Sequence, residues 1–64
     1  MKPFQERVVE EKKELDSKIE KLITFLESDA FKELPEPERE RLTRQEHIMV
    51  KYSDVLTARI QNFA

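Results

Sequence analysis

The 64-residue sequence contains no cysteine, no glycine and no tryptophan, and only three prolines. Without cysteine there is no disulfide framework and no thiolate metal site. Without glycine there is no phosphate-cradling loop of the dinucleotide-binding or P-loop type, because both loops need glycine where the backbone approaches the phosphate. These absences exclude several large classes of enzyme.

The sequence also lacks an excess of charge of one sign. Twelve basic and fourteen acidic residues give a net charge of -2, with six basic and seven acidic residues in 1–27 and the same numbers in 28–64. Duplex nucleic acid needs a clustered basic face, so we expect no such partner. No apolar run approaches the roughly 20 residues that span a bilayer, and no signal peptide follows Met1. We therefore expect a cytosolic protein with no membrane partner.

The apolar residues that are present recur with helical spacing in two segments. The first stripe consists of Val8, Leu15, Ile19, Leu22 and Leu26, widened by Ile23 and Phe25. The second consists of Leu42, Met49, Leu56 and Phe63, joined by Ile48, Tyr52, Val55 and Ile60. The spacing predicts one domain, 1–64, with a helix over 4–28, a turn over 29–36 and a helix over 36–62.

Two long helices with a short connection predict an all-α antiparallel two-helix hairpin. Each apolar stripe is wider than one helix–helix seam requires, and a chain this short rarely builds a sufficient core alone. The extra apolar residues therefore need a partner. We expect that partner to be a second copy, which makes the protein a homo-oligomeric helical bundle.

Polar residues occupy positions that the repeat assigns to the seam between the helices. If Leu26 lies opposite Leu42, residues whose numbers sum to roughly 68 face each other. On the first helix the polar seam positions are Gln5 and Lys12, and on the second they are Gln45, Tyr52 and Arg59. The register gathers Arg7, Glu11, Lys12, Tyr52 and Arg59 near the open end of the hairpin, with Gln45 near the turn.

This polar set has two interpretations. In the structural one, Arg59 pairs with Glu11, Lys12 extends along the surface, Tyr52 is an amphipathic core residue and Gln45 fixes the register. In the functional one, oligomerisation forms a pocket for an anionic aromatic ligand. Guanidinium and ammonium groups bind phosphate, and a phenol ring stacks on a base. The predicted ligand-binding residues are Arg7, Lys12, Gln45, Tyr52 and Arg59.

A catalytic interpretation has little support. His47 is the single histidine, so the sequence has no paired-histidine zinc site, and we interpret His47 as a surface residue. The serines have no base near them in sequence. We expect no enzyme activity, no catalytic residues, no metal and no cofactor.

The chain resembles a family of small helical proteins of tailed bacteriophages that are usually described as crAss-phage-related. The resemblance runs from Gln5 to Phe63. It is carried by Gln5-Glu6-Arg7-Val8-Val9, Glu11-Lys12, Glu14-Leu15, Lys18-Ile19, Lys21-Leu22, Phe25, Phe31, Leu34-Pro35, Glu38, Arg41-Leu42, Gln45, Met49, Tyr52-Ser53, Leu56 and Arg59-Ile60. The resemblance implies a phage origin and a place of action in the bacterial cytosol.

In architecture the chain is also similar to the short helical sponges with which phages block CBASS or Thoeris immunity. The expected function is non-enzymatic sequestration of a nucleotide-derived immune signal, such as a cyclic oligonucleotide or an ADP-ribose derivative. The alternative is a coiled-coil interaction or structural module that binds a host or phage protein through Ile23, Phe25, Ile48 and Val55.

Overall fold

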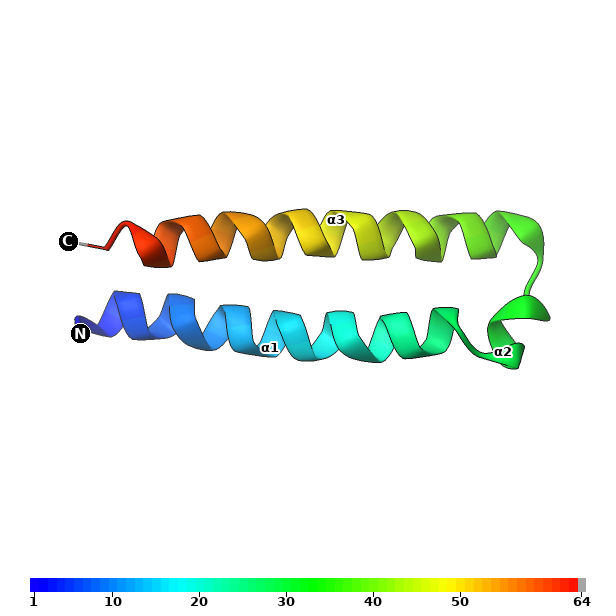
Figure 1. Cartoon of the computed structure of the whole chain (residues 1–64), viewed down its shortest axis with the longest axis horizontal. Helices are drawn as coiled ribbons and strands as arrows, with labels where there is room; N and C mark the ends of the chain where they lie inside the picture. Colours follow the sequence, from blue (N-terminus) through cyan, green and yellow to red (C-terminus); the bar gives the residue numbers. More distant parts are fainter. Residues whose placement is uncertain (64) are drawn as a thin grey trace.

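In the computed structural model, two long antiparallel helices lie side by side with both chain ends at the same end of the molecule (Figure 1). The structure describes residues 1–63; Ala64, the last residue of the expected domain, lies outside the described residues. Helix α1 spans Pro3–Leu26, the single-turn helix α2 spans Asp29–Lys32, and α3 spans Glu36–Gln61. The all-α class is confirmed, with no strand among the described residues.

The ends of the helices follow from local chemistry. Pro3 is the first residue of α1, where its missing N–H costs no hydrogen bond. α1 ends at Leu26, two residues before the predicted 28, because Ser28 instead caps α2: its Oγ accepts from the N–H of Phe31 at 3.2 Å. Pro35 is the N-cap residue of α3, and Glu36 and Glu38 lie in its first turn, where the helix dipole favours negative charge.

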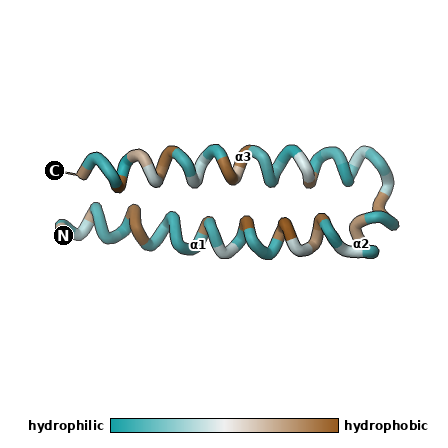
Figure 2. Tube along the Cα trace, in the orientation of Figure 1, coloured by the Kyte–Doolittle hydropathy of each residue, from teal (hydrophilic) through white to brown (hydrophobic). Residues whose placement is uncertain are grey.

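The core is a thin seam between α1 and α3. Val8, Leu15, Ile19 and Leu56 are its buried apolar residues, and Leu56 alone has no exposed surface. Met49, Ile60 and Phe63 are partly buried and pack against this cluster. The hydropathy colouring in Figure 2 shows short apolar segments separated by polar ones along both long helices. The molecule measures 47 × 14 × 13 Å, so nearly every residue is close to its surface.

One aromatic pair lies at the open end of the hairpin and another lies near the turn. At the open end the rings of Phe4 and Phe63 meet edge to face, with centroids 6.1 Å apart. Near the turn, Phe25 and Phe31 make the same kind of contact at 6.1 Å and hold α2 against α1. Among the described residues, no helix is long and apolar enough to cross a membrane.

Candidate functional site

The seam positions of α3 differ from the predicted ones. The residues of α3 that face α1, together with Phe63 just beyond its end, form a core stripe. Its members are Leu42, Glu46, Met49, Ser53, Leu56, Ile60 and Phe63, and every one is buried or half-buried. Gln45, Tyr52 and Arg59, which were predicted in the seam, are exposed. That placement is wrong because the step that follows each of Leu42, Met49 and Leu56 is four residues long, not three. The intermediate seam positions therefore lie one residue later than predicted.

A second stripe with the same alternating spacing lies on the exposed surface of α3. We call it the outer stripe: Arg41, Gln45, Ile48, Tyr52, Val55, Arg59 and the C-cap residue Asn62, all exposed. Each member precedes a core-stripe residue by one position, which corresponds to a rotation of about 100° around the helix. The outer stripe therefore runs along the flank of α3, beside the seam.

The outer stripe is apolar at its centre and basic or polar at its ends. Ile48 is 59% exposed, Val55 56% and Tyr52 43%. No acidic residue belongs to the stripe, although the chain has fourteen. Arg41 is paired with Glu38 at 2.9 Å, whereas the Arg59 guanidinium forms no ion pair with Glu11 or any other described carboxylate. The stripe thus presents an aromatic ring, an available guanidinium and an amide on one face.

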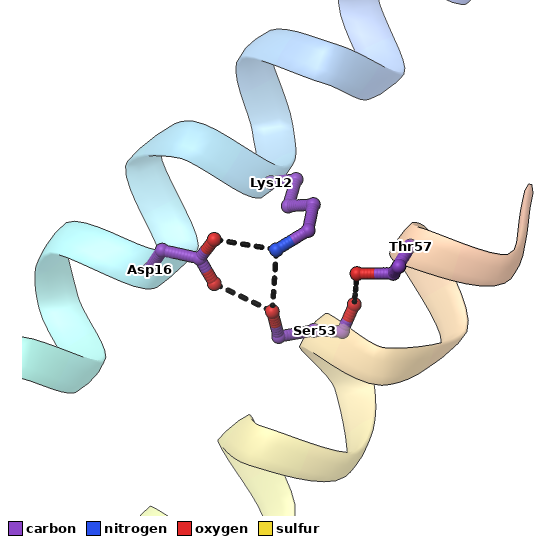
Figure 3. A network of polar contacts seen from close by, with 4 residues as sticks. All are labelled: Lys12, Asp16, Ser53 and Thr57. Atoms are coloured by element: carbon purple, nitrogen blue, oxygen red, sulfur yellow. Dashed lines mark hydrogen bonds and ion pairs between the residues drawn. The ribbon is translucent and has the colours of Figure 1, made fainter. Parts of the chain in front are cut away.

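The first-helix seam positions are as predicted, and both polar residues there have partners. Gln5 is 6% exposed, and its Oε1 accepts from the backbone N–H of Lys2 at 2.9 Å. Lys12 is half-buried and reaches across the seam toward α3 (Figure 3). Gln5 is therefore held at the start of α1, and Lys12 belongs to a network between the helices.

That network joins Lys12 and Asp16 of α1 to Ser53 of α3 (Figure 3). The Lys12 ammonium donates to Asp16 Oδ2 at 2.5 Å and to Ser53 Oγ at 3.1 Å. The Ser53 hydroxyl in turn donates to Asp16 Oδ1 at 2.5 Å, and Thr57 donates to the Ser53 carbonyl at 3.1 Å. All three seam-facing groups are therefore satisfied within the monomer.

The network lowers the pKa of Asp16 below its ordinary value. The main cause is the hydrogen bond from Lys12, followed by the one from Ser53, and both stabilise the charged carboxylate. The Asp16 side chain remains 45% exposed, so solvent screens the ion pair. Asp16 and Ser53 were absent from the predicted site. The signal that would have found Ser53 is the four-residue step from Met49, and the signal for Asp16 is its i,i+4 spacing from Lys12.

The five predicted ligand-binding residues are divided between separate faces. Gln45, Tyr52 and Arg59 share the outer stripe, Lys12 lies in the network with Ser53, and Arg7 is exposed on α1. Among residues 1–63, no hydrogen bond or ion pair links any two of the five. The amide of Gln45 donates only to the sulfur of Met49, at 3.8 Å.

Among the grooves on the described surface are two shallow ones that are not lined by Gln45, Tyr52 or Arg59. One, of about 440 Å³, lies beside Lys12 and Asp16. The other, of about 590 Å³, is lined by Phe31 of α2 and by residues of α3 that include Arg44 and His47. The His47 side chain is 67% exposed, with Nε2 3.6 Å from Glu46 Oε1, as expected for a surface histidine.

Fold and surface together define a small all-α protein whose two long helices leave a second, apolar and basic stripe uncovered. The chain belongs to the Sequestin family: the family model described as Sequestin matches residues 2–62. The match covers all three helices in full and every predicted site residue. No significant match was found among curated proteins or among solved structures.

Proposed function

We propose that the protein is a phage-encoded, non-enzymatic sponge that binds and sequesters a nucleotide-derived immune signal in the cytosol of the infected bacterium. The signal would be a cyclic oligonucleotide or an ADP-ribose derivative of the kind used by CBASS or Thoeris defence. The name of the Sequestin family supports a sequestering role. We also propose that the protein is related to the small crAss-phage-related proteins that its sequence resembles.

The observation that carries the proposal is the chemistry of the outer stripe. Tyr52 and Arg59 are exposed on one face, and the stripe contains no carboxylate that would repel a phosphate. An aromatic face stacks on a base, and a guanidinium binds phosphate oxygens with two parallel hydrogen bonds. A ligand with both a base and phosphates can use both contacts.

Lys12 and Arg7 have different parts in this proposal. The Lys12 ammonium already donates to Asp16 and Ser53, so it would bind phosphate only by exchanging one of these acceptors. Arg7 is exposed on α1 and would supply an additional charge. We therefore assign the main contacts to Tyr52 and Arg59, with Gln45 as a hydrogen-bonding residue.

We also propose that the protein works as a homo-oligomer. Within residues 1–63 the monomer buries four apolar side chains, whereas Ile48 and Val55 remain more than half exposed on the outer stripe. Chains of this length rarely gain more than about 3–5 kcal/mol from a single core, and association is a common way to add stability. A second copy would cover the exposed apolar centre.

The test is direct binding followed by recovery of the ligand. Calorimetry with a panel of cyclic oligonucleotides and ADP-ribose derivatives should identify a tight ligand, and heating the complex should release that ligand chemically unchanged. Arg59→Ala should weaken binding by about tenfold or more, because a charge-assisted hydrogen bond is lost. Lys51→Ala is the matched control, since it removes an exposed cation of α3 outside the stripe. Binding by none of the panel would sink the proposal, and release of an altered product would show an enzyme instead.

The alternative function is an interaction module, and the exposure of Ile48 and Val55 favours it. In that case these residues, with Ile23 and the half-buried Phe25, would pack against a host or phage protein. Replacing Ile48 and Val55 by lysine would then abolish capture of that protein, whereas Arg59→Ala would not. A sponge predicts loss of ligand binding on Arg59→Ala with the oligomeric state retained.

A further inference from the structure

The spacing within the outer stripe limits what one chain can do with it. Tyr52 lies seven positions after Gln45, and Arg59 lies seven positions after Tyr52. At 1.5 Å per residue, Gln45 and Arg59 lie about 21 Å apart along the helix axis. A single small ligand lying on one copy of α3 would therefore not contact both ends of the stripe.

The stripe reads nearly the same from either end. Counting outward from Tyr52, an aliphatic residue follows on each side, then an arginine or glutamine, then an arginine or asparagine. Suppose that two copies of α3 pack antiparallel, with the two Tyr52 residues facing each other. Each stripe residue of one copy then faces a stripe residue of the other copy, and the two residue numbers add up to 103 or 104. The facing pairs are Arg41 with Asn62, Gln45 with Arg59, Ile48 with Val55, and Tyr52 with itself.

Charge favours this antiparallel arrangement over a parallel one. In the antiparallel pairing each stripe arginine faces a neutral amide of the second copy. A parallel pairing would instead place Arg41 against Arg41 and Arg59 against Arg59, and like charges directly opposite each other are destabilising. Both arrangements would bury Ile48 and Val55, so the arginines decide between them.

We infer that two copies of the chain pair antiparallel through their outer stripes, and that each end of this interface forms one anion-binding site. The site consists of Arg59 from one copy and Gln45 from the other, with Tyr52 toward the centre. This inference rests on the proposed function for the identity of its ligand. The two-fold symmetry makes the two sites equivalent, so each chain contributes to both and the dimer binds two ligands.

The pairing is testable by cysteine crosslinking, because the natural chain contains no cysteine. Under mild oxidation, Tyr52→Cys should form a dimer with itself. Ile48→Cys alone should not, because the two cysteines would lie about 11 Å apart along the axis, beyond the reach of a disulfide. A mixture of Ile48→Cys with Val55→Cys should form the mixed dimer.

Val50→Cys is the matched control for these variants. Val50 is exposed but lies outside the stripe, so Val50→Cys should form no disulfide crosslink on oxidation. Self-crosslinking of Ile48→Cys and of Val55→Cys would show parallel pairing and overturn the inference. No crosslink in any variant, with helicity retained by circular dichroism, would overturn it as well.

The shared site is testable by mixing two variants that each lack one half of it. Arg59→Ala and Gln45→Ala should each bind ADP-ribose, used as the probe, about tenfold or more weakly. Subunit exchange between equal amounts of the two variants makes about half of the dimers mixed. In a mixed dimer one of the two sites has both Arg59 and Gln45, and the other has neither. Tight binding should therefore return at about a quarter of all sites.

The two proposals fail in different ways. If the crosslinks appear as expected but mixing restores no binding, the site lies within one chain and the shared site is wrong. If the crosslinks appear but the natural protein binds neither ADP-ribose nor any other member of the panel, the proposed function falls and the shared site with it, while the antiparallel pairing stands.

Discussion

Ser53 occupies a core position of α3, and its hydroxyl is satisfied by charged partners from α1. It lies between Met49 and Leu56 in the core stripe and is 7% exposed. A serine so placed is costly unless it is hydrogen-bonded, and here Lys12 donates to it while Asp16 accepts from it. The network therefore favours the observed register between α1 and α3, as a polar residue does in a coiled coil.

Removing the Ser53 hydroxyl should weaken the contact between the helices. Ser53→Ala is expected to lower the free energy of unfolding by about 1 kcal/mol relative to Ser17→Ala, as typical for one lost hydrogen bond. Ser17 is exposed on α1, and both substitutions gain the same helix propensity, so the comparison isolates the seam contact. Urea unfolding followed by circular dichroism measures the difference. Equal stability of the two variants would mean that the network contributes nothing.

The lowered pKa of Asp16 predicts a specific loss of stability in acid. Because the folded chain holds this carboxyl charged below its ordinary value of 3.8, the unfolded chain binds more protons in that range and stability rises with pH. The contribution is complete above the ordinary value and is lost as pH falls through the lowered one. The difference in Tm between the natural protein and Asp16→Asn should therefore be largest above about pH 5 and shrink toward pH 2.

The control for this pH series is Asp54→Asn. Asp54 is exposed on α3 and forms no ion pair among the described residues. Its replacement removes an exposed carboxylate without removing an ion pair, so the Tm loss of Asp16→Asn is compared with that of Asp54→Asn at each pH. A constant difference between Asp16→Asn and the natural protein from pH 2 to pH 7 would contradict the role assigned to the carboxylate.

At the scale of the elements, much of the fold was predictable from local rules. Pro3, Pro35 and Pro37 mark helix starts, and the recurrence of Leu42 and Leu56 at multiples of seven identifies the face that packs on α1. The seam positions that lie between these apolar residues were not predictable in this way. The larger apolar surface of its side chain favours Tyr52 over Ser53 at a seam position. The structure instead buries Ser53, and Lys12 and Asp16 of the opposite helix complete its hydrogen bonds. That information belongs to the pair of helices and is absent from either one.

The same limit applies to the candidate site. The residue types chosen from the sequence, Gln45, Tyr52 and Arg59, do lie on one face, because they share a seven-residue spacing on one helix. Lys12 is separated from them, because its partner Ser53 lies about 100° around α3 from Tyr52. Spacing within a helix was therefore sufficient to group residues of α3, and insufficient to place residues of α1 beside them.

The turn depends on one capping residue, which gives a prediction for α2. Ser28 accepts from the N–H of Phe31, and this bond begins the single turn that brings Phe31 against Phe25. Ser28→Ala should lower the free energy of unfolding by about 1 kcal/mol. Ser28→Asp should retain most of the stability of the natural protein, since an aspartate carboxylate also caps a helix. Thermal unfolding compares the variants, and equal losses for alanine and aspartate would show that the hydroxyl does not act as a cap.

For the whole molecule, the central feature is the imbalance between its two α3 stripes. The core stripe is covered by α1, and the outer stripe, with the same spacing, is covered by nothing within the described chain. A 47 Å rod that is only 13–14 Å across has little interior, so the apolar residues of a second stripe have no place inside it. Association of two chains would bury these apolar residues between the chains. The stability of the protein would then depend on its concentration.

That linkage predicts a melting temperature that depends on protein concentration. For a dimer, a hundredfold dilution changes the free energy of association by about 2.7 kcal/mol, or about 1.4 kcal/mol per chain. At about 4–8 °C per kcal/mol, Tm should fall by about 5–10 °C. Val55→Lys should remove this dependence, because it places a charge in the apolar centre of the outer stripe. Val50→Lys makes the same change at an exposed valine outside the stripe and should leave the dependence intact. A Tm that is independent of concentration in the natural protein would show a stable monomer.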